Sequence, residues 1–167
     1  AVDYVEPLPV ERSDPSALLE EPWFVEGLVL QPAVAGAVRS LLGAGFGLPP
    51  AMANHVGKCP EPRPLGWHVD GGNMHTFALN YLQVFCLMQD TTVEMGPTEI
   101  LPGSHFLLGQ SALVSHYGLI RGTKKCIGPV GTVIITCYPI WHRRCKATAP
   151  SGTRHVFKYN YLRNTAP

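Results

Sequence analysis

The sequence predicts a mainly β fold, a jelly-roll-like double sheet that follows a short N-terminal helical segment. From about residue 51 onward, short stretches of high β-propensity alternate with residues that are typical of turns. The stretch from Tyr81 to Met88 is nearly all apolar, which is typical of a strand buried on both faces. Six strands are expected, at residues 52–56, 65–69, 80–87, 98–101, 132–137 and 155–162.

One amphipathic helix is expected before the strands, from Pro32 to Gly43. Proline occupies its first turn and glycine follows its end, as is common for helices. Its apolar residues recur at helical spacing, at Val34, Val38, Leu41 and Leu42. Further upstream, Ser13-Asp14-Pro15 offers a helix start. We therefore expect one domain, in which residues 1–50 form a helical lead-in packed on a barrel of residues 51–167.

The composition predicts a globular chain with a sizeable core, because 46% of the 167 residues are hydrophobic and 15% are charged. A formal net charge of +1 gives no electrostatic argument for a nucleic-acid partner. Two short basic clusters, Lys124-Lys125 and Arg143-Arg144 with Lys146, are interpreted as solvated loops.

Neither a leader nor a membrane segment is expected from the residues given. The sequence has no run of 18 apolar residues, and its first residues lack a basic region followed by an apolar one. Its five cysteines include no Cys-x-x-Cys pair, so we expect reduced cysteines in an intracellular protein rather than a zinc ribbon. A location in the cytoplasm or an organelle interior, a small-molecule substrate, and no membrane or nucleic-acid partner are expected. The oligomeric state stays open.

The tripeptide His68-Val69-Asp70 is the strongest chemical signal. In a strand, alternate side chains share a face, so His68 and Asp70 can bind one metal ion together. A third ligand must come from a distant strand, and His142, after the strand expected at 132–137, is the natural candidate. Two imidazoles and one carboxylate on one face of an octahedron are typical of non-heme iron(II) oxygenases. A zinc site with histidine ligands alone would instead suit hydrolysis.

A second motif accompanies these residues, the segment Gly96-Pro97-Thr98-Glu99-Ile100-Leu101-Pro102-Gly103-Ser104-His105. It resembles the Pro-Gly-Ser-His segment of the phytanoyl-CoA dioxygenase family. The order of motifs along the chain is also similar to that family: first His68-x-Asp70, then this segment, then Gly131-Thr132 opening a strand, then Trp141-His142 and a basic residue. The resemblance covers roughly residues 50 to 163.

The resemblance implies a double-stranded β-helix, a jelly-roll or cupin-like barrel, with iron(II) held by His68, Asp70 and His142. It implies 2-oxoglutarate as cosubstrate, bound to the iron through its C1 carboxylate and keto oxygen, and O₂ as oxidant. The far carboxylate of the cosubstrate needs a cation, and Arg154 fits the family's offset after the distal histidine if the intervening loop is one residue longer. Arg143 and Arg144 are the alternatives.

Other cosubstrate contacts are expected around the same metal ligands. Thr98 matches a position that binds 2-oxoglutarate through its hydroxyl in some relatives. Several relatives carry a polar side chain where this chain has Gly66, and Gln83, Asn80 and Tyr81 are candidates for its role. Pocket-lining loops are expected at residues 73–79 and 110–123.

The sequence therefore predicts a 2-oxoglutarate-dependent dioxygenase that hydroxylates a small organic molecule and releases succinate and CO₂. Relatives that halogenate lack the metal carboxylate, so the presence of Asp70 favours hydroxylation. A cupin-like metal enzyme without 2-oxoglutarate, or a non-catalytic barrel, is the alternative. Of the other histidines, His105 is expected to be structural, His75 is a candidate pocket residue, and His155 is expected to face away from the pocket because it follows Arg154 in a strand.

Overall fold

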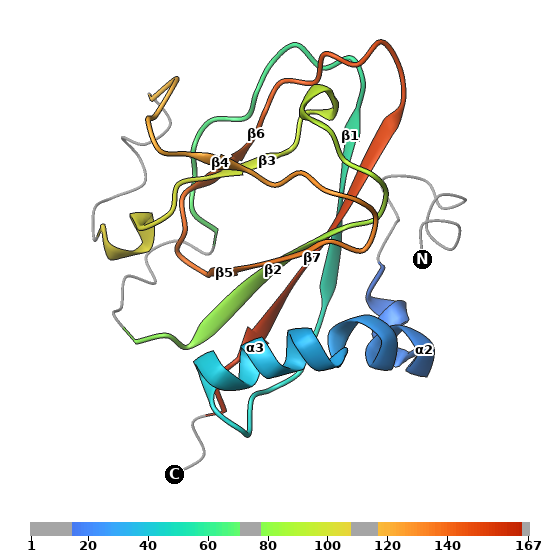
Figure 1. Ribbon diagram of the computed structural model, residues 1–167, viewed down its shortest axis with the longest axis vertical. Helices are drawn as coiled ribbons and strands as arrows, with labels where there is room; N and C mark the ends of the chain where they lie inside the picture. Colours follow the sequence, from blue (N-terminus) through green and yellow to red (C-terminus); the bar gives the residue numbers. More distant parts are fainter. Residues whose placement is uncertain (1–14, 71–77, 108–116, 165–167) are drawn as a thin grey trace.

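The computed structural model describes residues 15–70, 78–107 and 117–164. Two antiparallel sheets make up most of the structure, and helices cover one face of the larger sheet (Figure 1). The helical elements are the 3₁₀ helix η2 (Pro15–Glu20), α2 (Pro22–Phe24), the π-helix η3 (Val25–Val29), α3 (Pro32–Leu42) and the 3₁₀ helices η4 (Val93–Met95) and η5 (Ser104–Phe106). The strands are β1 (Met52–Lys58), β2 (Tyr81–Leu87), β3 (Thr98–Ile100), β4 (Lys124–Lys125), β5 (Val133–Cys137), β6 (His142–Arg144) and β7 (Thr153–Leu162). The predicted mainly β class is confirmed.

Helix α3 begins and ends at the residues that the sequence predicts. The side chain of Gln31 accepts hydrogen bonds from two backbone N–H groups of the first turn, and Gly43 adopts a φ of 97° after the last turn. Val34, Val38 and Leu42 are buried, but Leu41 is 44% exposed and does not belong to the apolar face. Among the described residues no single helix has the length and apolar character of a membrane span, although Pro22–Val29 and Pro32–Leu42, bent by 65° at their break, meet that criterion as a pair.

The larger sheet has the strand order β1-β7-β2-β5, and its two faces have different roles. Its outer face packs against the helices through a large apolar cluster that includes Val84, Phe157 and Tyr161. The hydroxyl of Tyr161 donates a hydrogen bond to the Val29 carbonyl at 2.5 Å, which ties the central strand to the helical segment. The inner face carries a smaller apolar cluster, formed by Phe85, Leu87, Val156 and Ile134.

The smaller sheet has the order β4-β3-β6 and lies across the inner face of the larger one (Figure 1). Glu99 pairs with Arg143 in its register, and Ile100 pairs with His142. Because opposite residues in an antiparallel pair share a face, His142 and Ile100 lie on one face while Glu99 and Arg143 lie on the other. This register puts a predicted metal ligand between the two sheets.

Two sequence predictions are wrong in this region. Residues 65–69 do not form a strand, and only His68 makes an antiparallel bridge, with His142. Leu65 donates a backbone hydrogen bond to Arg144, and His68 exchanges two with His142, so three steps along this segment match two along β6 and a regular ladder does not form. The basic clusters are not simply solvated loops, because Lys124–Lys125 form β4 and Arg143 and Arg144 belong to β6, where Arg143 is buried.

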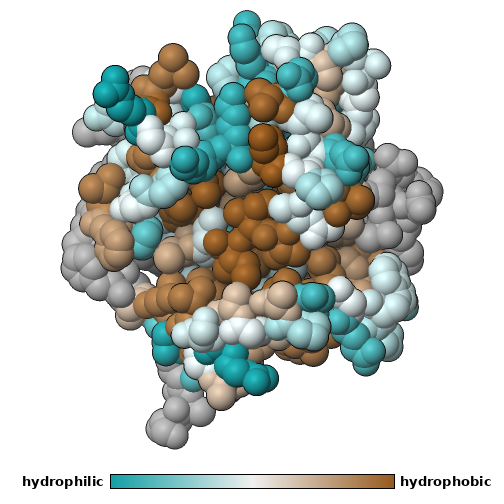
Figure 2. All heavy atoms as spheres, in the orientation of Figure 1, coloured by the Kyte–Doolittle hydropathy of each residue, from teal (hydrophilic) through white to brown (hydrophobic). Residues whose placement is uncertain are grey.

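The edge strand β5 leaves an apolar surface beside the helices. Apolar residues gather there on the face shown in Figure 2, just above α3. A groove of about 450 Å³ lies in this region, lined by residues that include Leu28, Val34, Val133 and Ile135. Because it opens on the side of β5 and the helices, this groove is separate from the pocket between the sheets.

Candidate metal centre

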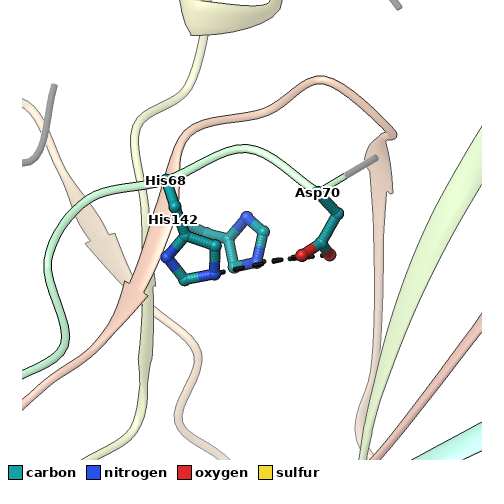
Figure 3. Close-up of side chains that lie close together, drawn as sticks. All are labelled: His68, Asp70 and His142. Carbon is teal, nitrogen blue, oxygen red and sulfur yellow. Dashed lines mark ion pairs between the residues drawn. The ribbon is translucent and has the colours of Figure 1, made fainter. Parts of the chain in front are cut away.

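His68, Asp70 and His142 converge in the structure (Figure 3). One ligand atom from each lies within 4.8 Å of the others. The Nε2 atom of His142 is 3.5 Å from Oδ2 of Asp70, and Nε2 of His68 is 3.9 Å from Oδ1. Two imidazole nitrogens and a carboxylate oxygen at such distances form a donor set that suits a divalent transition metal.

Both imidazoles present the correct nitrogen to a cation. Nδ1 of His68 lies 2.9 Å from the Gly66 carbonyl oxygen, and Nδ1 of His142 lies 3.1 Å from that of Ile140. A carbonyl only accepts, so each Nδ1 carries the proton and each Nε2 offers its lone pair. Burial lowers the pKa of His142 to about 4, against the opposing effect of Asp70, so this ligand is neutral near pH 7.

The carboxylate of Asp70 is ionised. Burial alone would raise its pKa, but the hydrogen bonds from Lys158 and Gln83 and the positive charge of Lys158 outweigh burial, and the pKa falls below its ordinary value. Lys158 donates to Oδ2 from 2.7 Å, and the amide of Gln83 donates to the same oxygen. The centre therefore combines a neutral His142 imidazole with an anionic carboxylate, the states that metal ligation requires.

The segment from Gly96 to His105 contacts the backbone on both sides of His142. Gly96 adopts a φ of +66°, and a Cβ there would lie 2.8 Å from the Cys145 carbonyl oxygen, so glycine permits close approach between the start of β3 and the end of β6. The buried hydroxyl of Ser104 accepts a hydrogen bond from the backbone N–H of Trp141 at 2.8 Å. This bond fixes the residue directly before the metal-facing His142.

Ser104→Ala is expected to lower the free energy of unfolding by about 1–2 kcal/mol, because it leaves the N–H of Trp141 without an acceptor inside the protein. Urea unfolding measures this change. The matched control is Ser40→Ala on the exposed side of α3, where the hydroxyl donates only to the Ala37 carbonyl and a loss below about 0.5 kcal/mol is expected. Equal effects of the two variants would contradict the role given to Ser104.

A pocket of about 380 Å³ opens beside the three side chains, between the sheets. His68 and His142 line it together with Arg154 and Thr98, two residues that the sequence predicts for cosubstrate binding. Arg154 is 2% exposed, and its Nε and Nη1 atoms have no hydrogen-bond partner among the described residues. Burial and the nearby Arg144 lower its pKa to about 10, so the guanidinium is still charged at neutral pH.

The alternatives to Arg154 have partners of their own. Arg143 turns to the outer face of the smaller sheet, where its Nε donates to Glu99 at 2.8 Å and its guanidinium lies 4.6 Å from the centre of the Trp67 ring. Arg144 lines the pocket, but it donates to the Arg63 carbonyl at 3.3 Å and lies 3.8 Å from a carboxylate oxygen of Glu61. Arg154 is thus the free cation among these three.

The remaining predicted residues take other positions. Gln83, a candidate for the cosubstrate, donates to Asp70, and neither Asn80 nor Tyr81 is among the residues that line this pocket. His155 faces Asn54 on the opposite side of the sheet, as strand alternation predicts. His75, residues 73–77 of one expected pocket loop, residues 110–116 of the other, and the Ser13-Asp14 helix start lie outside the described residues.

Among the pocket residues that sequence reasoning missed, two are titratable, His55 and Lys158. His55 pairs with Val156 across β1 and β7, and Lys158 lies two residues further along β7 on the same face. Lys158 was detectable from alternation, since Arg154, Val156 and Lys158 must share a face if they lie in one strand. His55 required the register between β1 and β7, which links distant parts of the chain.

No protein-family model matches the chain, and no curated protein does. Solved structures do match it. The apo form of ThoJ, described as a non-heme monooxygenase, is 19% identical with a TM-score of 0.65, and the match covers 84% of this chain and 55% of that one. AviO1 from Streptomyces viridochromogenes Tue57 is 19% identical with a TM-score of 0.65, covering 88% and 63%.

A third match is HygX from Streptomyces hygroscopicus, solved with nickel and 2-oxoglutarate bound. It is 15% identical with a TM-score of 0.62, and the match covers 91% of this chain and 72% of that one. At these identities the matches show a shared fold, the β architecture that ThoJ and HygX also have. The chain spans little more than half the length of ThoJ.

Proposed function

We propose that this chain is the catalytic core of a non-heme iron(II), 2-oxoglutarate-dependent oxygenase that hydroxylates a small organic molecule. In this proposal the two sheets are those of a double-stranded β-helix of the phytanoyl-CoA dioxygenase type. His68, Asp70 and His142 hold the iron, and Arg154 holds the far carboxylate of the cosubstrate. HygX, whose fold the chain shares, has been solved with nickel and 2-oxoglutarate bound, which supports this choice of cosubstrate.

The observation that carries the proposal is the buried guanidinium of Arg154, which lies in the same pocket as two candidate metal ligands and whose Nε and Nη1 have no hydrogen-bond partner in the described part of the chain. A buried cation without a partner is costly, so its presence in the pocket favours an anionic ligand there. Gly57 of β1 pairs with Arg154 of β7, and a Cβ atom on residue 57 would lie 3.4 Å from Nη2 of Arg154. The missing side chain leaves room for the guanidinium to meet a carboxylate.

Each residue of the chain has a separate task in this reaction. The two imidazoles and the ionised Asp70 would hold the cation beside the pocket. Arg154 and the buried hydroxyl of Thr98 orient the cosubstrate, and the apolar layer around Phe85 and Val156 limits access of water. When bound, iron(II) with 2-oxoglutarate supplies the activation of O₂ that is coupled to release of succinate and CO₂.

Arg154→Met is expected to weaken binding of 2-oxoglutarate about 10- to 100-fold, because hydrogen bonds to a charged partner contribute about 1.5–3 kcal/mol. Calorimetry on protein loaded with Co(II) measures this dissociation constant without any need for the substrate. Binding of Co(II) itself should stay within about threefold of wild type, since Arg154 is not a metal ligand in this arrangement.

Arg39→Met is the matched control, because Arg39 lies on the exposed side of α3. It is expected to bind 2-oxoglutarate as wild type does. If Arg154→Met also retains wild-type affinity, the cosubstrate assignment fails and a metal enzyme without a keto acid becomes the better account. Succinate production by iron-loaded wild-type protein supplied with 2-oxoglutarate and O₂ is the second readout.

A further inference from the structure

The metal-facing carboxylate is held by residues that neither motif contains. Oδ2 of Asp70 receives a hydrogen bond from Nζ of Lys158 at 2.7 Å and another from the amide of Gln83. Gln83 is fully buried, and the side chain of Lys158 is 17% exposed. Both side chains therefore have little freedom to leave the carboxylate for bulk solvent.

These two donors come from adjacent strands of the larger sheet. Lys158 of β7 pairs with Phe85 of β2, two residues from Gln83 on the same face. The two side chains thus rise from neighbouring positions on the inner face and meet at one oxygen. Such convergence fixes both the direction and the rotation of the Asp70 carboxylate.

The histidines have a different anchor. His68 and His142 exchange backbone hydrogen bonds of 3.0 Å in both directions, and His142 belongs to β6 of the smaller sheet. Asp70 follows two residues after this bridge and lies in a turn. The smaller sheet consequently sets the imidazoles, while the larger sheet sets the carboxylate through its side chains.

We propose that Lys158 and Gln83 are positioning residues of the metal centre, an inference that rests on the function proposed above. Their hydrogen bonds to Oδ2 fix the rotation of the carboxylate that would hold the cation together with His68 and His142. Outer partners of metal ligands commonly affect metal affinity about 10- to 100-fold.

If Lys158 acted only through charge repulsion, its replacement would have the opposite effect on metal affinity. An ammonium group near a divalent cation disfavours the cation, so a purely electrostatic role means that removing the charge tightens metal binding. Positioning means that removing the donor weakens it. The two accounts therefore differ in the sign of the change, which makes the comparison decisive.

The experiment measures the dissociation constant of Mn(II) by calorimetry, with the d–d absorption of the Co(II)-loaded protein as second readout. Lys158→Met and Gln83→Leu are each expected to weaken Mn(II) binding about 10- to 100-fold and to change the shape of the Co(II) spectrum. Lys158→Arg keeps a charged donor and is expected to stay within about threefold of wild type. Lys58→Met, on the exposed side of β1, is the matched control and should not differ from wild type.

Thermal unfolding of the metal-free proteins verifies that each variant is folded, and Gln83→Leu tests the same carboxylate if Lys158→Met unfolds. Unchanged or tighter Mn(II) binding by the folded variants overturns the positioning role. Asp70→Ala distinguishes failure of the proposed metal centre from failure of the proposed positioning role. If Asp70→Ala binds Mn(II) like wild type, the metal centre itself is wrong, whereas a loss confined to Asp70→Ala refutes only the role of Lys158 and Gln83.

Discussion

His142→Ala is expected to abolish succinate formation and to weaken divalent metal binding by more than about 100-fold, beyond the effect typical of outer partners. His142 is 4% exposed, its Nε2 faces Asp70 at 3.5 Å, and its Nδ1 is engaged by the Ile140 carbonyl. Its replacement removes one of the three proposed ligands, and no other His, Cys, Asp or Glu among the described residues belongs to this cluster. Mn(II) calorimetry and succinate production from 2-oxoglutarate by the iron-loaded protein measure the two losses.

The matched control is His105→Gln, a histidine of the Pro-Gly-Ser-His segment outside the cluster of ligands. It is expected to retain metal binding. His142→Gln accompanies the alanine variant, because its larger side chain avoids a cavity and separates loss of the ligand from loss of packing. Succinate formation that survives in both His142 variants would refute the assignment of the metal centre.

Arg143→Met is expected to lower the free energy of unfolding by about 3–5 kcal/mol, because it leaves the buried carboxylate of Glu99 without its cation. The pair is 2.8 Å apart, and its side chains are 10% and 8% exposed. The guanidinium also stacks on Trp67 and donates to the Gly118 carbonyl at 2.6 Å. Urea unfolding measures the loss, and Arg121→Met at an exposed position is the control.

Acid should reduce this difference. Burial raises the pKa of Glu99, but the hydrogen bond from Thr123 and the interactions with Arg143 outweigh it, so the folded-state pKa lies below the ordinary value of 4.5. The stabilisation is therefore complete above about pH 4.5 and is lost as the pH falls through the folded-state pKa. A difference between wild type and Arg143→Met that is as large at pH 3 as at pH 7 would contradict the role of this ion pair.

Much of the framework could be predicted from local sequence patterns. The boundaries of α3, β2 and β5 agree with the expectations to within about one residue, because apolar periodicity, proline and glycine act locally. The convergence of His68, Asp70 and His142 could be anticipated from the order of motifs, although Asp70 lies in a turn rather than in a strand.

Features that depend on register could not be predicted in this way. Glu99 meets Arg143 only because β3 pairs with β6, and Lys158 reaches Asp70 only because the inner face of β7 lies beside the turn that carries this residue. Neither spacing nor composition indicates such pairs, since 44 and 88 residues separate their members. At residues 65–69 the local preference for a strand is not realised, because the backbone hydrogen bonds of this segment to β6 are out of step.

The division of anchors between the sheets has a consequence for folding. A divalent ion held by His68, His142 and Asp70 would connect the smaller sheet, which carries His142, to the larger sheet, whose Lys158 and Gln83 hold Asp70. Since the ion binds only the assembled centre, its binding free energy adds to the cohesion of the layers. Under the proposed function, the metal-free protein would be the less cohesive form, in which the two sheets separate more readily.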